Sequence, residues 1–536
     1  MSRLILPSLA GLLLAAAPLA AQLAETDRPL TYSDRSEVSE AEAAAMRRIE
    51  GHMAFLASDA MAGRDTGTIQ GELAARYVAT QLHSFGFEPA GDDGTFLQTY
   101  PLVRTWLDEE SLGFDMITAD GERHGFRPYE DYALRNVGPD GMDLDVELVF
   151  AGHGLVHEDS EVDDFAGLDL EGKLAVVLWG SPSGVTEPGL VMAAQWRSKQ
   201  REALARGAVG ILLVTTPGDE REAGWFRYAA ASMRHEGMAL GGSEPRSRRR
   251  PPRIYLAGEA GRELFAAAGH DLDAEIAARE STTNLGGFPM DGVRLAVKGA
   301  TAREDIVSWN TVGILPGSDP ELADEVIVLS AHMDHVGVED DDVFNGADDN
   351  ASGTTTVMMV AQALARDPLA QRRSVAVLLV SGEERGLLGS EWWVNNPTIP
   401  IERVVANINI DMVGRNASGE IGVTPSPEHA DYNTLVERAV GLGPEADIDV
   451  EWFAGEGDFR RRVDEYYYRS DHVNFAKADI PVIFFFAGEH EDYHKPTDTL
   501  DKIDIPKMLK VANLVTILTR TVANDIERPV LLGDDR

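Results

Sequence analysis

The chain of 536 residues contains no cysteine. This absence excludes disulfide bonds, thiolate metal sites, cysteine nucleophiles and lipid-modified cysteines. Positive charge is scarce as well, because 48 Lys and Arg stand against 89 Asp and Glu, which gives a formal net charge of -41. So large a negative charge argues against nucleic acids and anionic membrane surfaces as partners.

Long apolar runs are missing beyond the N-terminus, so no later segment is expected to span a membrane. The chain begins MSRLILPSLAGLLLAAAPLAAQ, with Arg3 before an apolar core and small residues up to Ala21. This pattern is typical of a secretory signal peptide, and we expect residues 1–21 to be removed. Pro7 and Pro18 interrupt the short core, which argues against a membrane anchor. The mature protein is therefore expected to be exported, either to the periplasm or out of the cell.

The length exceeds what one hydrophobic core usually supports, and the 44% of hydrophobic residues suffice for packed domains. Residues 22–140 are expected to form the N-terminal part of a main domain. Residues 141–288 behave as an inserted unit, with the apolar runs VELVF, KLAVVLWG and VGILLV. Residues 289–536 then carry the main part of the first domain, including its candidate site.

Two amphipathic helices are predicted near the start of the mature chain. Ser39 and Glu42 have the spacing of a capping box at the beginning of the first helix. Gly86 follows the apolar positions of the second helix and is well placed to end it.

The last part of the chain alternates strands and helices. Its strands are continuous apolar runs: EVIVLS (325–330), SVAVLLV (374–380), VVANINI (404–410) and IPVIFFF (480–486). Helices are predicted over 351–365 and near 506–525. Continuous rather than alternating apolar runs are typical of a sheet that helices cover on both faces. The sequence therefore predicts an α/β fold with a mostly parallel mixed sheet.

Polar residues with metal-binding side chains follow every one of these strands. In chain order they are His332 and Asp334, Asp348 and Asp349, Glu383 and Glu384, Asp411, and Tyr493 and His494. Because ligands bind beyond the carboxyl ends of strands in such sheets, we expect these side chains to converge. A lone Glu-Glu pair would ordinarily lie in a solvated loop, but this pair belongs to the converging set.

Two imidazoles and several carboxylates suit zinc, with cobalt or manganese as substitutes. One zinc ion needs only three of these side chains, so the surplus indicates two ions that share a bridging carboxylate. Without a metal, the same side chains would form a pocket of mutually repelling anions.

The ordered motifs HMD, GADDNASG, SGEERGLLGS, NIDMVG and YHKPTDT resemble those of the zinc-dependent exopeptidases. That family includes the bacterial leucyl aminopeptidases, aminopeptidase Y, glutamate carboxypeptidase, the animal glutaminyl cyclases and the catalytically dead transferrin receptor. The resemblance covers residues 40–100 and 290–525. In the insertion, DDFAGLDLEGKLAVVL and KQREALARGAVGILLV are similar to a smaller, β-rich α/β protease-associated domain.

The resemblance implies a role for each candidate residue. The implied ligands of two zinc ions per chain are His332, Asp349, Glu384, Asp411 and His494. Among them Asp349 would be the bridge, while the family does not fix which outer ligands share an ion. Glu383 would be the general base that takes a proton from metal-bound water, so that the hydroxide attacks the peptide carbonyl. Asp334 would orient His332 by a hydrogen bond, and Tyr493 would help to stabilise the oxyanion.

Some nearby residues receive other interpretations. Asp348 could compete as the bridge, but the family's bridging aspartate directly precedes an Asn/Asp-x-Ser-Gly turn, so Asp348 is interpreted as a charge at a helix N-terminus. His335 is interpreted as a histidine behind the ligands or on the surface. Residues 470–472 read Ser-Asp-His, but adjacent residues cannot form a catalytic triad and no nucleophile-elbow motif is present.

The resemblance implies a dizinc aminopeptidase that acts on peptides. A carboxypeptidase acting on C-terminal, including acidic, residues is the alternative, and Arg469 or residues 460–462 could supply its cation. The acidic segment EHED (489–492) could instead bind a free ammonium group. A glutaminyl cyclase would use one zinc ion and usually lacks the inserted domain. A receptor-like protein would have lost ligands that are present here. The oligomeric state and the preferred residue are left open.

Overall fold

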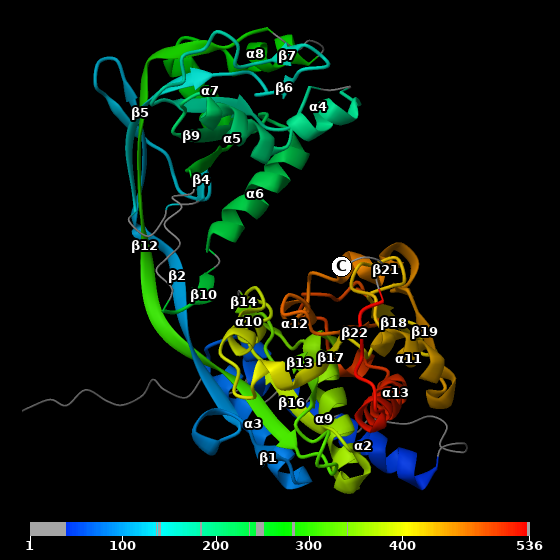
Figure 1. Cartoon of the computed structure of the whole chain (residues 1–536). Coiled ribbons are helices and arrows are strands. Elements are labelled where there is room, and N and C mark those ends of the chain that lie inside the picture. Colours follow the sequence, from blue (N-terminus) through cyan, green and yellow to red (C-terminus); the bar gives the residue numbers. More distant parts are fainter. Residues whose placement is uncertain are drawn as a thin grey trace, which may run out of the picture. The chain divides into compact units, whose positions relative to one another are not determined.

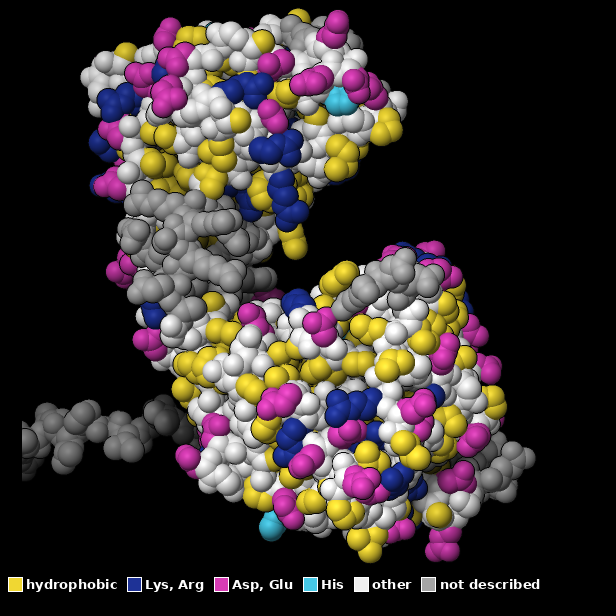
Figure 2. All heavy atoms as spheres, in the orientation of Figure 1, with side chains coloured by type: hydrophobic (Ala, Val, Ile, Leu, Met, Phe, Trp, Pro, Cys, Tyr) yellow, Lys and Arg dark blue, Asp and Glu magenta, His cyan; other side chains and the backbone are white. Residues whose placement is uncertain are grey.

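The computed structural model describes residues 39–135, 137, 141–182, 185–234, 236–242, 251–280, 285–339 and 341–532. The expected signal peptide, residues 1–21, lies outside the described residues. Within the described part, none of the helices combines the length and the apolar character needed to cross a bilayer. Acidic side chains are scattered over the visible surface of the molecule rather than gathered in one patch (Figure 2).

The chain divides into two compact units. The first comprises Met1–Thr99 and Trp309–Arg536, and the second comprises Tyr100–Ser308. The expected insertion, residues 141–288, lies inside the second unit, whose limits are wider on both sides. One reason is that strand β4 (Tyr132–Arg135), which precedes the expected boundary, pairs antiparallel with β11 (Arg253–Leu256) of the same unit.

The first unit is built on a mixed sheet in the order β19-β18-β22-β17-β13-β16 (Figure 1). The strands are β13 (Val326–His332), β16 (Ser374–Val380), β17 (Val404–Asp411), β18 (Glu420–Thr424), β19 (Asp449–Glu451) and β22 (Val482–Phe486). The four central strands β16, β13, β17 and β22 are parallel to one another. Antiparallel strands flank them, since β18 pairs with β22 and the end of β12 (Phe288–Leu315) pairs with β16. The predicted mostly parallel mixed sheet is confirmed.

Helices cover both faces of this sheet. On one face Ile327, Leu329 and Leu379 pack in a core with α2 (Glu40–Leu56), α3 (Ile69–Phe85), α9 (Gly353–Ala365) and α13 (Ile505–Asn524). On the other face Val328 and Leu378 pack with α10 (Leu388–Asn395) and α12 (His472–Ala476). Successive residues of a strand point to opposite faces, so a strand buried on both sides must be apolar throughout.

The predicted start of α2 and the predicted end of α3 are confirmed. The amide of Glu42 donates to the Ser39 hydroxyl at 3.2 Å, and the amide of Ser39 donates to the Glu42 carboxylate at 2.9 Å. Helix α3 ends at Gly86, whose φ of 98° lies in the left-handed region that favours glycine. These two helices close the face of the sheet that carries the larger core.

The second unit has its own core and its own strands. Strands β5 (Met142–Phe150), β8 (Leu174–Leu178), β9 (Gly210–Val214) and β11 pair in parallel in that order. Helices α5 (Trp196–Ala205), α6 (Glu220–Arg234), α7 (Gly258–Ala267) and α8 (Leu272–Arg279) accompany them. Its interior is apolar and includes Phe150, Leu212 and Phe265. The unit is therefore an α/β body in its own right.

Candidate active site

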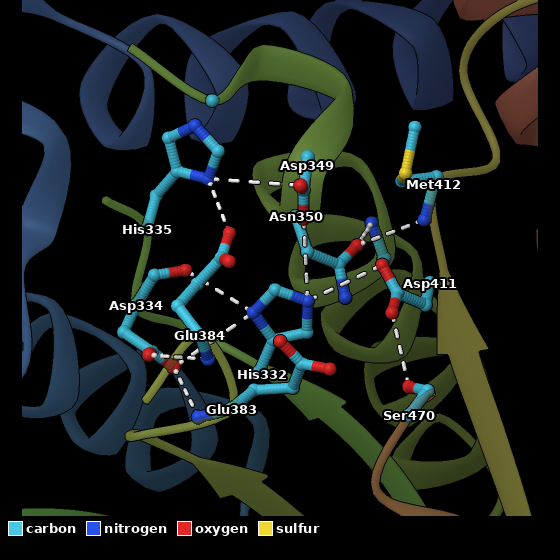
Figure 3. A network of polar contacts seen from close by, with 12 residues as sticks. His332, Asp334, His335, Asp349, Asn350, Glu383, Glu384, Asp411, Met412 and Ser470 are labelled. Carbon is cyan, nitrogen blue, oxygen red and sulfur yellow. Dashed lines mark hydrogen bonds and ion pairs between the residues drawn. The ribbon is translucent and has the colours of Figure 1, made fainter. Parts of the chain in front are cut away.

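The candidate residues come from the carboxyl ends of the central strands, as the topology requires. His332 is the last residue of β13, and Asp411 is the last residue of β17. Asp349 lies in the irregular turn η3 (Ala347–Ser352) that precedes α9, and Glu383 and Glu384 follow β16. Figure 3 shows these side chains pointing toward one another. The structure thus brings together residues that are separated by up to 162 positions, since His494 contacts the same group as His332.

One part of the site is formed by His332, Asp411 and one oxygen of Asp349. The Nε2 atom of His332 lies 3.2 Å from Oδ1 of Asp411 and 3.4 Å from Oδ1 of Asp349. All three side chains are at most 9% exposed. Three donor atoms that converge in this way can hold one metal ion.

The other part is formed by His494, Glu384 and the second oxygen of Asp349. The Nε2 atom of His494 lies 3.1 Å from Oδ2 of Asp349 and 3.0 Å from Oε2 of Glu384. Asp349 therefore presents one carboxylate oxygen to each histidine. This is the position of a bridging ligand between two metal ions.

The charge of the site supports metal binding. Burial raises the pKa of Glu383 well above its ordinary value, and the charges of Glu384 and Asp411 add to the effect. Burial would lower the pKa of His332, but the charges of Asp411 and Glu383 raise it well above its ordinary value. Both shifts result in part from the dense negative charge of neighbouring carboxylates, which two divalent ions would neutralise. Imidazole and carboxylate donors fit zinc.

Glu383 takes no part in the ion pairs that link the five implied ligands. Its side chain is partly exposed and lines the pocket in front of the site together with Asp349 and Asp411. One of its oxygens also lies within 4.8 Å of donor atoms of His332 and Asp411. A carboxylate that faces the pocket beside the metal-binding atoms is suited to accept a proton from an attacking water molecule.

Asp334 acts on a different partner than expected. The Nδ1–H of His332 donates to the backbone carbonyl of Asp334 at 3.1 Å, while the Asp334 carboxylate lies 3.7 Å away. That carboxylate instead accepts the amides of Glu383 and Glu384, both at 3.3 Å. The carboxylate therefore holds the Glu-Glu turn in place, and the carbonyl of the same residue orients His332.

The residues with other interpretations are placed as follows. His335 is fully buried, and its Nδ1 lies 2.8 Å from Oε1 of Glu384. It also belongs to a group of potential metal donors with Asp349 and Glu384. Asp348 accepts the amide of Gly414 at 2.6 Å and lies 3.2 Å from Nε2 of His490. Asp348 lies in the first turn of η3, directly before α9, so its interpretation as a charge at a helix N-terminus stays a prediction, and its carboxylate is also bound to these two partners.

The Ser-Asp-His segment does not form a triad. The Ser470 hydroxyl donates to Oδ2 of Asp411 at 2.9 Å and accepts from Nδ2 of Asn409 at 2.9 Å. Asp471 accepts from the Ser390 hydroxyl, and the ring of His472 stacks on an aromatic neighbour. Sequence reasoning missed the contact of Ser470 with a candidate ligand, because Ser470 comes from the loop before α12 and not from a strand end.

A pocket opens in front of the site. It is lined by Asp349, Glu383, Asp411, Met412, Tyr466, Arg469, Phe484, Phe486, Glu489 and Tyr493. Arg469 donates to Glu489 at 2.8 Å and to the hydroxyl of Tyr493 at 3.2 Å. Burial raises the pKa of Tyr493, and the charges of Asp349 and Glu384 raise it further, so its hydroxyl stays protonated as a donor.

Some of the residues considered for binding the charged terminus of a substrate pair with residues that do not line this pocket. Arg460 pairs with Glu420 at 3.1 Å, and Arg462 pairs with Glu428 at 2.8 Å. Arg469 lines the pocket and is one of the four arginines considered for binding a terminal carboxylate. Glu489, from the acidic segment 489–492, also lines the pocket.

Comparisons with known proteins point to one family. The family model described as peptidase family M28 matches residues 310–519. Leupeptin-inactivating enzyme 1 of Streptomyces exfoliatus is 29% identical over 243 residues, which cover 44% of this chain and 45% of that protein. A probable leucine aminopeptidase of Arthroderma otae is 28% identical over 238 residues, which cover 42% of this chain and 62% of that protein. The matches therefore span about half the length of these curated relatives.

The solved structures support the fold. An aminopeptidase from Aneurinibacillus sp. strain AM-1 matches with a TM-score of 0.54 at 21% identity, covering 91% of this chain and 96% of that one. This likeness extends over both units of the chain and confirms the fold class. The resemblance to the zinc-dependent exopeptidases is confirmed by the family match, whereas that match does not reach the expected insertion.

Ser470→Ala tests whether the hydrogen bond to Asp411 supports a metal ligand. Loss of the hydroxyl leaves one oxygen of Asp411 and the amide of Asn409 without this partner. We expect affinity for zinc to fall by about 10-fold to 100-fold, as is usual when a group behind a ligand is removed. Competition with a chelator measures the affinity. Ser84→Ala, on an exposed helix position, is the control. Equal zinc affinity in both variants would contradict the role of Ser470.

Proposed function

We propose that the protein is an exported dizinc aminopeptidase, which removes N-terminal residues from peptides. The match of residues 310–519 to the model of peptidase family M28 supports this proposal. The observation that carries the proposal is the arrangement around Asp349, whose two oxygens face His332 and His494 separately. Glu383 beside this bridge supplies the proton acceptor that peptide hydrolysis requires. The names of the relatives, one of them a probable leucine aminopeptidase, support an aminopeptidase.

In the proposed mechanism each residue of the site has a separate role in hydrolysis. The implied ligands that would hold two zinc ions are His332, Asp349, Glu384, Asp411 and His494. Bound zinc would supply Lewis acidity, which lowers the pKa of a water molecule and polarises the substrate carbonyl. Glu383 accepts a proton from the attacking water, whose oxygen forms a bond to the peptide carbon. Tyr493 donates a hydrogen bond to the resulting oxyanion. Glu383 then returns the proton to the leaving nitrogen as the C–N bond breaks.

The pocket supports an aminopeptidase over a carboxypeptidase. A carboxypeptidase needs a cation for the terminal carboxylate of its substrate. Arg469 is already bound to Glu489 and to the Tyr493 hydroxyl. Glu489 is 24% exposed and can accept a second hydrogen bond, from the free ammonium of a substrate. We therefore assign Glu489 to the substrate's N-terminus and Arg469 to the support of Glu489 and Tyr493.

Export and the inserted domain belong to the same proposal. Residues 1–21 have the pattern of a signal peptide, so the mature protein would work in the periplasm or outside the cell. Residues 141–288, within the second unit, would form a protease-associated domain that limits the size of the substrate. Removal of this segment without a change in the preference for short over long peptides would contradict that role.

The substrate class is tested with short peptides that carry either a free or an acetylated N-terminus. We expect the purified mature protein to cleave only the free-amine set, because Glu489 binds an ammonium. A chelator should abolish cleavage and added zinc should restore it. Removal of C-terminal residues from the acetylated set would instead establish the carboxypeptidase alternative.

Glu383→Gln tests the general base. The amide keeps the size of the side chain but cannot accept the proton, so we expect kcat/KM to fall by about 100-fold to 10,000-fold. Zinc content should stay unchanged, which elemental analysis of the dialysed protein measures. Glu391→Gln, at an exposed position of α10, should behave like the original protein. Retention of activity in Glu383→Gln would rule out this mechanism.

Glu489→Gln tests the ammonium site. The amide can still accept a hydrogen bond from Arg469 but lacks the charge that attracts an ammonium. We expect KM for free-amine peptides to rise by about 10-fold, the scale of a hydrogen bond to a charged group, with kcat little changed. Glu491→Gln is the control, since the carboxylate of Glu491 is 73% exposed and pairs loosely with Arg415. A fall in kcat at constant KM would instead assign Glu489 to the positioning of Tyr493.

A further inference from the structure

A buried arginine lies directly behind the metal-binding group. Arg64 ends the short helix η1 (Asp59–Arg64) and is 1% exposed. Its hydrogen bonds all go to backbone carbonyls. Its Nε donates to Met333 at 2.9 Å, and its Nη2 donates to Gly346 at 3.0 Å. Its Nη1 donates to Leu56 and to Asn345, both at 2.6 Å.

The carbonyls that Arg64 binds belong to the segments that carry ligands. Met333 directly follows His332, and Asn345 and Gly346 lead into the turn that presents Asp349. One guanidinium thus ties the end of β13 to the start of η3. The rigid planar fork of an arginine can hold several carbonyls in fixed directions at once, which an ammonium on a flexible stem cannot do.

The neighbours of Arg64 in the chain contact the remaining ligand segment. The carboxylate of Asp65 pairs with Arg385, the residue after Glu384, at 2.6 Å. The Thr66 hydroxyl donates to Oδ2 of Asp334 at 2.9 Å, and Asp334 in turn accepts the amides of the Glu-Glu turn. Between them, Arg64, Asp65 and Thr66 therefore contact the segment after β13, the segment before α9 and the segment after β16.

The position of Arg64 is costly unless it serves the site. Burial lowers the pKa of Arg64 to about 10, and the nearby charges of Asp349, Asp334, Asp498 and Glu384 act against this effect. A buried charge seldom stabilises a fold better than apolar packing would. Its benefit here is a fixed cation near the carboxylates, together with fixed ligand segments.

We propose that Arg64 is a positioning residue of the metal site, which holds the segments bearing His332 and Asp349 through their backbone carbonyls, with Thr66 holding the Glu383–Glu384 turn through Asp334. The inference rests on the proposed function only in that the site binds zinc. It predicts an effect on zinc affinity that is separable from peptide hydrolysis.

The chain offers a matched control in Arg373. This arginine is also fully buried, and it donates to the carbonyls of Val522 at 2.9 Å and Ile526 at 3.2 Å. It lies just before β16, at the opposite ends of the strands from the candidate ligands. Arg373→Lys therefore changes a buried arginine that binds backbone carbonyls, together with its ion pair to Glu325 at 2.6 Å, without touching the site.

The experiment compares Arg64→Lys with Arg373→Lys, measuring the melting temperature and, by chelator competition, the zinc affinity. We expect both variants to melt earlier, but only Arg64→Lys to lose about 10-fold to 100-fold in zinc affinity. Thr66→Val, which keeps the shape of the side chain, is a milder second variant if Arg64→Lys does not fold. We expect its zinc affinity to fall as well, with little change in melting temperature.

The proposal would be overturned if Arg64→Lys bound zinc as tightly as the original protein does. If Arg64→Lys does not fold, unchanged zinc affinity in Thr66→Val would overturn it. So would an equal loss of affinity in Arg373→Lys, because the effect would then be general destabilisation. Failure of the proposed function is distinguishable from this outcome. An original protein that binds zinc but cleaves no peptide would contradict the aminopeptidase and leave the expected difference between the variants intact.

Discussion

Mutual repulsion of buried carboxylates is the constraint on which the rest of the structure depends. The central strands deliver Asp349, Glu383, Glu384 and Asp411 into one small volume. Such a group cannot remain fully ionised in a protein interior without cations. The positive charge that offsets this repulsion can come from His332, His335 and His494, from the buried Arg64 and from the inferred zinc ions. In the proposed mechanism one of these carboxylates, that of Glu383, is kept free to take a proton.

The parallel sheet explains why so much of the site is visible in the sequence. Continuous apolar runs identify the strands, and parallel strands place their carboxyl ends along one edge. A histidine or a carboxylate directly after such a run is therefore a candidate ligand without knowledge of the fold. His332 and Asp411, the last residues of β13 and β17, illustrate this most directly.

The supporting contacts could not be predicted in this way, because they depend on packing between distant segments. Arg64 reaches the carbonyl of Met333 across 269 positions, and it follows no strand. Ser470 approaches Asp411 from a loop of another layer. Asp334 was expected to act through its carboxylate on His332, but its carbonyl does so, since the preferred atom depends on the local path of the backbone. The limits of the second unit likewise depend on the partner that β4 finds in β11.

Anomalous diffraction from crystals of the mature protein grown with zinc would show whether two ions share Asp349. We expect two zinc ions about 3.5–4 Å apart, the usual spacing in paired metal sites. One oxygen of Asp349 should bind each ion, with His332 and Asp411 on one side and Glu384 and His494 on the other. A single ion, or two ions that do not share Asp349, would contradict the account.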